Sequence, residues 1–183
     1  LGINFEAPAK THSDKDPNLL PYTTVGDAIL DIAGLNEKDI PNHIALAHKP
    51  LVAERMSYVP EGGKLDLNTL PEHLQNATRK DSKTGKVANY SHVYKRLDRN
   101  KPSTTMVPGH NAFPIHPTLN RTLTPREAAR IQTFPDTLEF FGTRQQQCIQ
   151  AGNAVPPKMA EPFFKKINEY IEEFTKGNIG DEP

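Results

Sequence analysis

The residues of this chain best suited to a chemical task form a basic cluster near its middle. Between residues 79 and 101 the sequence holds eight basic side chains against two acidic ones, a net charge of +6 within a chain of formal net charge +0. Such a local excess of positive charge is typical of a surface that contacts phosphate groups. A solvated basic loop is the alternative, and it is slightly favoured while the cluster is taken by itself. The basic members are Arg79, Lys80, Lys83, Lys86, Lys95, Arg96, Arg99 and Lys101.

Three hydroxyl side chains follow this basic cluster. Ser103, Thr104 and Thr105 lie in a Pro-Ser-Thr-Thr run. Small hydroxyl groups on a turn are suited to donate hydrogen bonds to phosphate or sugar oxygens. They extend the predicted nucleic-acid surface beyond the last lysine.

Nucleophilic and metal chemistry find little support in the sequence. The single cysteine, Cys148, has no neighbour in sequence that would obviously activate its thiol, so we interpret it as a core or surface thiol. The seven histidines are not accompanied by cysteines or carboxylates at the spacing of metal ligands. We therefore expect neither a catalytic residue nor a metal site in this chain.

A capping signal predicts one short helix. Thr124 is a good N-cap residue and Glu127 follows three positions later, which is the pattern of a capping box. The helix is expected over 126–133. Within it Arg126, Glu127 and Arg130 could pair at helical spacing. Taken alone, this helix is interpreted as a small scaffold element with a surface ion pair.

A glycine turn and a long helix are predicted after it. Gly152 permits a positive φ and Asn153 can hydrogen-bond its own backbone, while Pro156 and Pro157 favour the start of a helix. Pro162 is expected either to kink that helix or to move its start later. The apolar stripe, which ends near Gly177 and has a period of about 3.6 residues, comprises Met159, Ala160, Phe163, Phe164, Ile167, Tyr170, Ile171 and Phe174.

Weaker signals outline the remaining elements. Residues 1–21 are expected to be extended and polar, and Thr24 with Asp27 predicts a capped helix over 24–34. Further short helices are predicted over 48–58 and 70–76, and short strands over 93–97 and 104–107. With 17 prolines and only 36% hydrophobic residues, the composition favours an irregular, loop-rich domain.

Several of these motifs together resemble the bacterial DNA cytosine-5 methyltransferases. Two blocks are similar to the last two sequence motifs of that family: Arg121-Thr-Leu-Thr-Pro-Arg-Glu-Ala-Ala-Arg-Ile-Gln-Thr-Phe-Pro-Asp, and Gln150-Ala-Gly-Asn-Ala-Val-Pro-Pro. The run from Tyr94 to Thr105 resembles the part of the family's target-recognition domain that lies on DNA. The resemblance covers roughly residues 20 to 175, and with it a DNA partner becomes the favoured interpretation of the basic cluster.

The resemblance implies an α+β fold in three parts. Residues 1–23 would be an extended linker segment, 24–120 a small irregular target-recognition domain with short strands and loops, and 121–183 the C-terminal helices that belong to an α/β methyltransferase catalytic domain. The first motif implies a structural role for Arg121, Thr124, Arg126, Glu127 and Arg130. The second implies that Gly152, Asn153, Ala154 and Val155 lie beside the cofactor, S-adenosylmethionine.

The family's other motifs are absent from the sequence. It contains no Phe-x-Gly-x-Gly turn, no Pro-Cys loop, no Glu-Asn-Val acid and no Gln-x-Arg-x-Arg strand. The expectation is therefore a C-terminal, double-stranded-DNA-recognising part of a DNA (cytosine-5-)-methyltransferase, inactive alone. The missing N-terminal catalytic half, or a partner subunit, would bind most of the S-adenosylmethionine. Two alternatives stay open: a non-catalytic DNA-binding or regulatory module, and one subunit of a naturally split enzyme.

The expected setting is the bacterial cytoplasm, in association with the nucleoid and with DNA methylation of the restriction-modification kind. One cysteine excludes an internal disulfide framework and fits a reducing compartment. No apolar run approaches the length of a membrane span, and no signal peptide is recognisable, so no membrane partner is expected.

Overall fold

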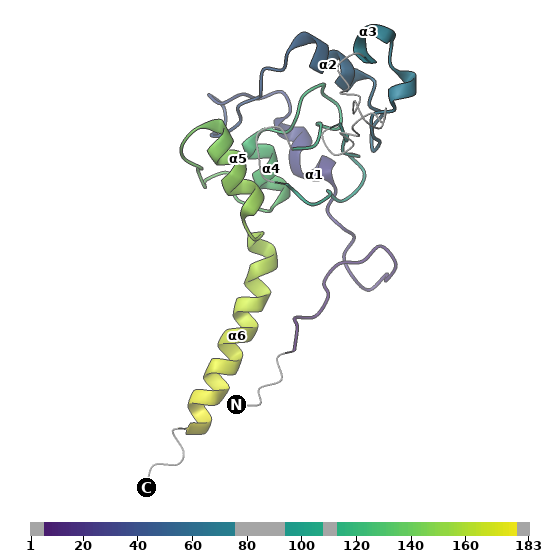
Figure 1. Ribbon diagram of the computed structural model, residues 1–183. Coiled ribbons are helices and arrows are strands. Elements are labelled where there is room, and N and C mark those ends of the chain that lie inside the picture. The colour runs from purple at the N-terminus through teal and green to yellow at the C-terminus, as the bar shows by residue number, and fades with distance from the viewer. Residues whose placement is uncertain (1–5, 76–93, 108–112, 179–183) are drawn as a thin grey trace, which may run out of the picture. The chain divides into compact units, whose positions relative to one another are not determined.

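The computed structural model describes residues 6–75, 94–107 and 113–178, which fall into two compact units (Figure 1). One unit is Thr23–Ala154, and the other joins the chain up to Tyr22 with the chain from Val155 onward. The expected domain boundary at residue 120 does not coincide with this division. Helices on both sides of that boundary share one hydrophobic core.

Helices supply nearly all of the regular structure. In order they are α1 (Val25–Ile29), the 3-10 helix η1 (Leu30–Ile32), α2 (Pro50–Ser57), the 3-10 helix η2 (Leu67–Thr69), α3 (Glu72–Gln75), α4 (Pro125–Ile131), α5 (Arg144–Asn153) and α6 (Pro157–Asn178). The predicted helices near the start of the chain and around residues 50 and 126 are thereby confirmed. Among the described residues no helix is both long enough and apolar enough to cross a bilayer.

The strands expected over 93–97 and 104–107 do not form in the described part of those ranges. Only isolated bridges occur there, pairing Lys95 with Lys64 and Arg96 with Ile115. Proline donates no backbone hydrogen bond and interrupts a ladder. Pro114 and Pro117 flank the bridge at Ile115, so pairing does not extend into a strand.

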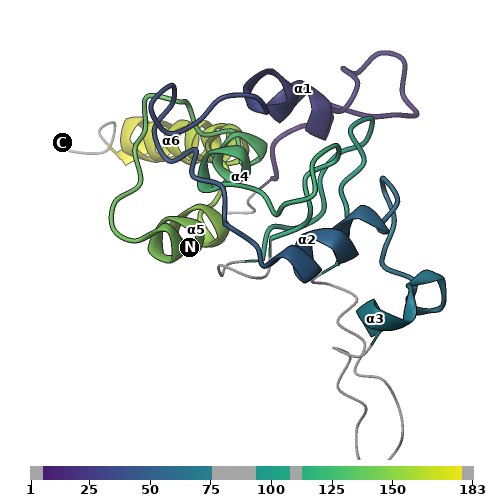
Figure 2. The same ribbon diagram turned by 90° about the horizontal axis from the view of Figure 1, so that it is seen from above.

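The main core lies between α1, α4 and α5. In both views α4 lies between the other two helices, and α2 and α3 lie farther along the unit (Figures 1 and 2). A second, smaller cluster of Met56, Val59 and Ile115 packs beside α2. The main core consists of Val25, Ile29, Leu97, Met106, Phe113, Leu123, Ala128, Ala129, Phe140, Cys148 and Ala151.

The two predicted capping boxes are present. The Thr24 hydroxyl accepts from the Asp27 N–H while the Asp27 carboxylate accepts from the Thr24 N–H, and Thr124 and Glu127 repeat this arrangement at α4. These bonds satisfy backbone donors that have no partner inside the helix. Both helices therefore begin where the sequence predicts.

The predicted glycine turn is wrong, because Gly152 and Asn153 form the last turn of α5. The chain leaves the helix only at Ala154, which is extended. The apolar pattern did not reveal α5, since its buried residues include Gln147 as well as Cys148 and Ala151. Its capping box, Thr143 with Gln146, was the available signal.

The predicted long C-terminal helix, α6, is confirmed. It begins at Pro157 and continues through Pro162, so the internal proline does not move the start of the helix. The Tyr170 hydroxyl accepts a hydrogen bond from the Glu6 N–H at 3.2 Å, within the same unit. Much of the apolar stripe of α6 is exposed: Phe164, Ile167, Ile171 and Phe174 are 41–65% exposed.

A close backbone approach fastens α1 to the chain near residue 99. The Gly26 N–H donates to the Arg99 carbonyl oxygen at 2.8 Å, and the Val25 N–H donates to the Lys101 carbonyl oxygen at 2.9 Å. A Cβ atom at position 26 would lie only 2.7 Å from the Arg99 oxygen. Glycine is therefore required there by space.

We predict that Gly26→Ala lowers the free energy of unfolding by about 1–3 kcal/mol, because α1 or the Arg99 backbone must shift to make room. Gly34→Ala is the matched control, since nothing lies within 4 Å of a Cβ at that position. It should be neutral or stabilising by less than about 1 kcal/mol. Denaturant unfolding of both variants measures the difference, and equal stabilities would contradict the close approach.

Candidate nucleic-acid interface

The segment 94–101 carries the four described residues of the basic cluster. Backbone hydrogen bonds tie it to the turn at Gly63, to Ile115 and to the start of α1. Its backbone is therefore fixed from three directions although it forms no strand. The other members of the cluster, Arg79, Lys80, Lys83 and Lys86, lie outside the described residues.

Arg96 is an internal residue, which corrects the expectation that it contacts DNA. It is 5% exposed. Its Nε donates to the Val59 carbonyl, its Nη1 to the His116 and Leu119 carbonyls, and its Nη2 to the Met56 carbonyl and Asn120 Oδ1, at 2.6–2.8 Å. A guanidinium has five N–H donors. All five are used inside the chain, so none is left for a phosphate.

Two of the remaining basic residues are paired with acids. Arg99 Nε lies 2.8 Å from Glu61 Oε1, and Lys101 Nζ lies 3.0 Å from Asp98 Oδ2. Hydrogen bonds from Arg99 lower the pKa of Glu61 to about 2. The two carboxylates therefore offset half of the positive charge of the four described basic residues.

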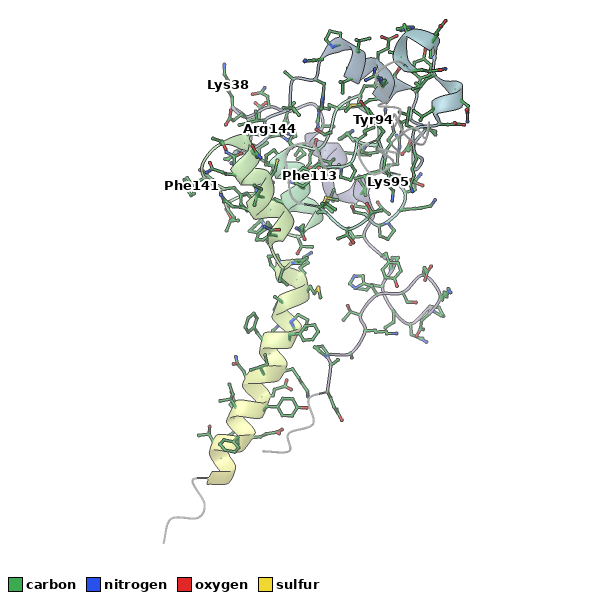
Figure 3. All side chains as sticks on the ribbon, viewed as in Figure 1. Lys38, Tyr94, Lys95, Phe113, Phe141 and Arg144 are labelled. Carbon is green, nitrogen blue, oxygen red and sulfur yellow. The ribbon has the colours of Figure 1, made fainter. Side chains whose placement is uncertain are left out.

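Lys95 and the hydroxyl run complete the described surface. In Figure 3, Lys95 lies on the side of the unit away from Phe141 and α5. Thr104 and Thr105 are exposed. The half-buried Ser103 donates its hydroxyl to the Thr104 carbonyl at 2.9 Å. Lys95 is half-buried, whereas the two threonines are exposed, as a phosphate contact requires.

The predicted structural motif at α4 is brought together around one buried carboxylate. Glu127 is fully buried and accepts from Arg121 Nη1 at 2.8 Å, from Arg121 Nη2 at 2.7 Å and from the Thr124 N–H at 2.8 Å. A buried carboxylate is tolerated when a guanidinium fork and further donors satisfy it. The pair thus fastens the start of α4 to the chain before it.

The expected pairing of charges along α4 is wrong. Arg126 is fully buried and donates to the carbonyls of Pro41, Pro135 and Leu138 and to Asn42 Oδ1. Arg130 pairs with Asp31, before α4 in the chain, and with Asp136, after it. Other segments surround α4 on most sides, so Arg126 and Arg130 bond to residues of those segments and not to each other's neighbours within the helix.

His116 lies beside this carboxylate. Its Nδ1 accepts from the Thr118 and Leu119 N–H groups, both at 3.2 Å, which places the proton of the neutral ring on Nε2. Nε2 lies 3.7 Å from Glu127 Oε1. Burial is the main cause that lowers the pKa of His116 to about 4. His116 is therefore neutral at pH 7. Separately, the described residues contain no group of side chains suited to a metal ion.

The four residues of the predicted cofactor site follow one another at the end of α5. Gly152 and Ala154 are half-buried, whereas Asn153 and Val155 are exposed. The Gln132 amide donates to the Ala151 carbonyl and ties this end of α5 to the residue after α4. Burial raises the pKa of the Cys148 thiol on the same helix. A raised pKa disfavours the thiolate, so Cys148 is suited to packing and not to nucleophilic attack.

The burial of His116 predicts a pH dependence of stability. Its folded-state pKa of about 4 lies below the ordinary histidine value of 6.5, so the unfolded state binds more protons between these values. The resulting stability is complete above pH 6.5 and falls as the pH drops towards 4, by up to about 3 kcal/mol. Burial also lowers the pKa values of His43 and His48, which act in the same direction.

His116→Asn tests this dependence, because asparagine retains an acceptor for the two N–H groups but does not titrate. We expect a shallower loss of unfolding free energy between about pH 6.5 and 4.5 than in the wild type, measured by chemical denaturation. His12→Asn is the control, since His12 is exposed. The same slope in all three proteins would show that His116 does not titrate below its usual range.

Comparison with known proteins identifies the family. The profile described as C-5 cytosine-specific DNA methylase matches residues 3–169. The Type II methyltransferase M.BbvI of Brevibacillus brevis is 34% identical over 167 residues, which are 90% of this chain and 40% of M.BbvI. The Type II methyltransferase M.AquIB of Picosynechococcus is 38% identical over 144 residues, which are 72% of this chain and 90% of M.AquIB.

A solved structure is also similar. It is described as that of a DNA modification methyltransferase encoded within a prophage of E. coli, with 29% identity and a TM-score of 0.49, and the match covers 73% of this chain and 30% of that one. The chain spans 40% of the length of M.BbvI. The family predicted from the motifs is confirmed by the sequence matches: the chain belongs to the C-5 cytosine-specific DNA methylases.

Proposed function

We propose that this chain is the DNA-recognising C-terminal part of a DNA (cytosine-5-)-methyltransferase, which transfers a methyl group from S-adenosylmethionine to cytosine. One observation carries the proposal: the family profile covers residues 3–169, yet the chain spans only 40% of M.BbvI. The absence of the Pro-Cys and Glu-Asn-Val motifs supports it further, because a nucleophile and an acid must then come from elsewhere.

Within this proposal the segment 94–105 faces double-stranded DNA. Lys95 and Lys101 would contact phosphates, and the exposed Thr104 and Thr105 would donate to the backbone. Arg96 is left out, because its donors are used internally. The undescribed basic residues of the cluster, Arg79 to Lys86, are retained in the proposed surface on their charge alone.

The end of α5 and the start of α6 would complete the catalytic domain. We place Gly152, Asn153, Ala154 and Val155 beside the S-adenosylmethionine pocket, as the family resemblance implies. The exposed apolar stripe of α6 supports a missing neighbour, since exposed apolar patches of this kind mark interaction sites. The N-terminal half of the enzyme would cover it.

A naturally split enzyme is the second candidate, and one observation favours it. The 144 matched residues make up 90% of M.AquIB. A relative whose extent is close to that of this region therefore exists as a protein in its own right. As a subunit, the present chain would have the same role, and the catalytic half would be a separate protein. A non-catalytic DNA-binding module would lack such a partner altogether.

We predict that this chain alone transfers no label from S-adenosylmethionine to duplex DNA. Transfer should appear when the catalytic portion, encoded upstream in the same reading frame or in an adjacent one, is added. Cys148→Ser is the control: because this thiol is buried and is not the nucleophile, the reassembled activity should persist. Robust transfer by the isolated chain would contradict the proposal.

A second prediction concerns the salt dependence of DNA binding by the reassembled enzyme. Replacing Lys95, Arg99 and Lys101 together by Gln should flatten the slope of log affinity against log salt by roughly 0.9 for each phosphate that the protein no longer neutralises. The control removes three exposed charges elsewhere, at Lys10, Lys38 and Lys49. An unchanged slope in the first variant, measured by fluorescence anisotropy, would move the DNA surface away from the segment 94–101.

A further inference from the structure

We infer that Arg99 reads a guanine in the recognised DNA sequence, and that Glu61 is the residue that positions it. The inference rests on the proposed function, because it assigns a specificity-determining pair to the proposed DNA surface. It differs from the phosphate contact that the basic cluster suggests for Arg99. We favour the base contact because Glu61 already occupies one edge of the Arg99 guanidinium and leaves another edge unused.

Glu61 holds one edge of the Arg99 guanidinium. Arg99 Nε donates to Glu61 Oε1 at 2.8 Å, and Arg99 Nη2 donates to Glu61 Oε2 at 2.9 Å. This side-on fork uses two of the five N–H groups. One remaining hydrogen on each of Nη1 and Nη2 forms the end edge of the group, and the third, on Nη1, points back towards Cδ.

The end edge is available to a ligand. The side chain of Arg99 is 43% exposed, and its three remaining N–H groups have no hydrogen-bond partner in the described parts of the chain. Two parallel donors on Nη1 and Nη2 match the O6 and N7 acceptors of guanine in the major groove, which is the commonest specific contact between arginine and a base. Glu61 therefore leaves free the edge that such a contact needs.

The backbone at Arg99 is unusually well fixed for an exposed side chain. Its N–H donates to Glu61 Oε1 at 2.9 Å, and its carbonyl oxygen accepts from the Gly26 N–H at 2.8 Å. The Gly62 N–H donates to the Leu97 carbonyl at 3.2 Å and fixes the turn that presents Glu61. A side chain held on a fixed backbone loses less conformational freedom on binding, and it can select one register on the DNA.

The charge balance also favours a base over a phosphate. A phosphate attracts net positive charge, and Glu61 offsets the charge of Arg99. A base edge is recognised by hydrogen-bond donors in the right positions, and the ion pair with Glu61 leaves such donors on Arg99 unused. Lys95 has no ion pair among the described residues, so it suits a phosphate better than Arg99 does. Lys101 is paired with Asp98 by one contact at 3.0 Å, but its side chain is 74% exposed, and an exposed pair of this kind is weak enough to give way to a phosphate.

The test uses the reassembled methyltransferase on a library of duplexes with randomised sequence, with methylated sites read by sequencing. The wild-type enzyme should yield a consensus that contains at least one guanine besides the target pair. Arg99→Gln should lower the preference for guanine at one position by about 10–100-fold and leave the other positions unchanged. Glu61→Gln should lower the preference at that same position by a smaller factor, although Arg99 is still present.

Two further variants keep the test decisive. Lys101→Gln removes a neighbouring charge from the same turn, and it should weaken methylation equally at all sequences. Arg99→Lys retains the charge without the fork, so it should behave like Arg99→Gln at the selected position. The fold of each variant is checked by thermal unfolding, and a midpoint equal to that of the wild type shows that the fold is retained.

Three outcomes would overturn the inference. An unchanged consensus in Arg99→Gln would make the Arg99–Glu61 pair a surface ion pair. A uniform loss at all sequences would make Arg99 a phosphate contact. A consensus without any further guanine would leave Arg99 nothing to read. A wild-type reassembled enzyme that methylates no defined sequence would instead refute the proposed function itself, which distinguishes the two failures.

Discussion

Buried guanidinium groups that donate to backbone carbonyls hold the unit Thr23–Ala154 together. A loop-rich chain leaves many carbonyl oxygens without the partners that a sheet would provide, and buried carbonyls need donors. Arg96 and Arg126 supply them. Arg96 joins segments up to 40 residues away in sequence, and Arg126 joins segments up to 85 residues away. The core between α1, α4 and α5 is small, so these long-range hydrogen bonds fix the path of the loops around it.

This use of arginine changes what the charge of the sequence means. A count of basic residues treats Arg96 and Lys95 alike, although Arg96 is buried with all its donors used and Lys95 is only half-buried with no ion pair among the described residues. The acids that neutralise the surface, Glu61 and Asp98, are likewise partners of particular cations. The described part of the cluster is therefore less positive than its count of basic residues indicates, and two of its cations, Arg99 and Lys101, are held in ion pairs.

The features that the sequence predicted well are those that depend on near neighbours. The capping boxes at Thr24 and Thr124 involve residues three positions apart, and the stripe of α6 repeats within one helix. The features it missed depend on distant segments. The burial of Arg96 requires carbonyls from residues 56 to 119, and the outward pairing of Arg130 requires Asp31. The strand expected at 93–97 is reduced to isolated bridges beside Pro114 and Pro117, and which distant segment would pair with it was not evident from its own residues.

The attachment of Arg99 to α1 through Gly26 has a consequence for how such a surface can change over evolutionary time. The backbone at positions 99 and 101 is bonded to a helix that is part of the core, so it cannot move without disturbing that core. At these two positions the bonds to α1 are made by backbone carbonyl oxygens and not by the side chains. On the proposed DNA surface, a change of the side chain at position 99 or 101 would therefore alter the DNA contact while the backbone keeps its path.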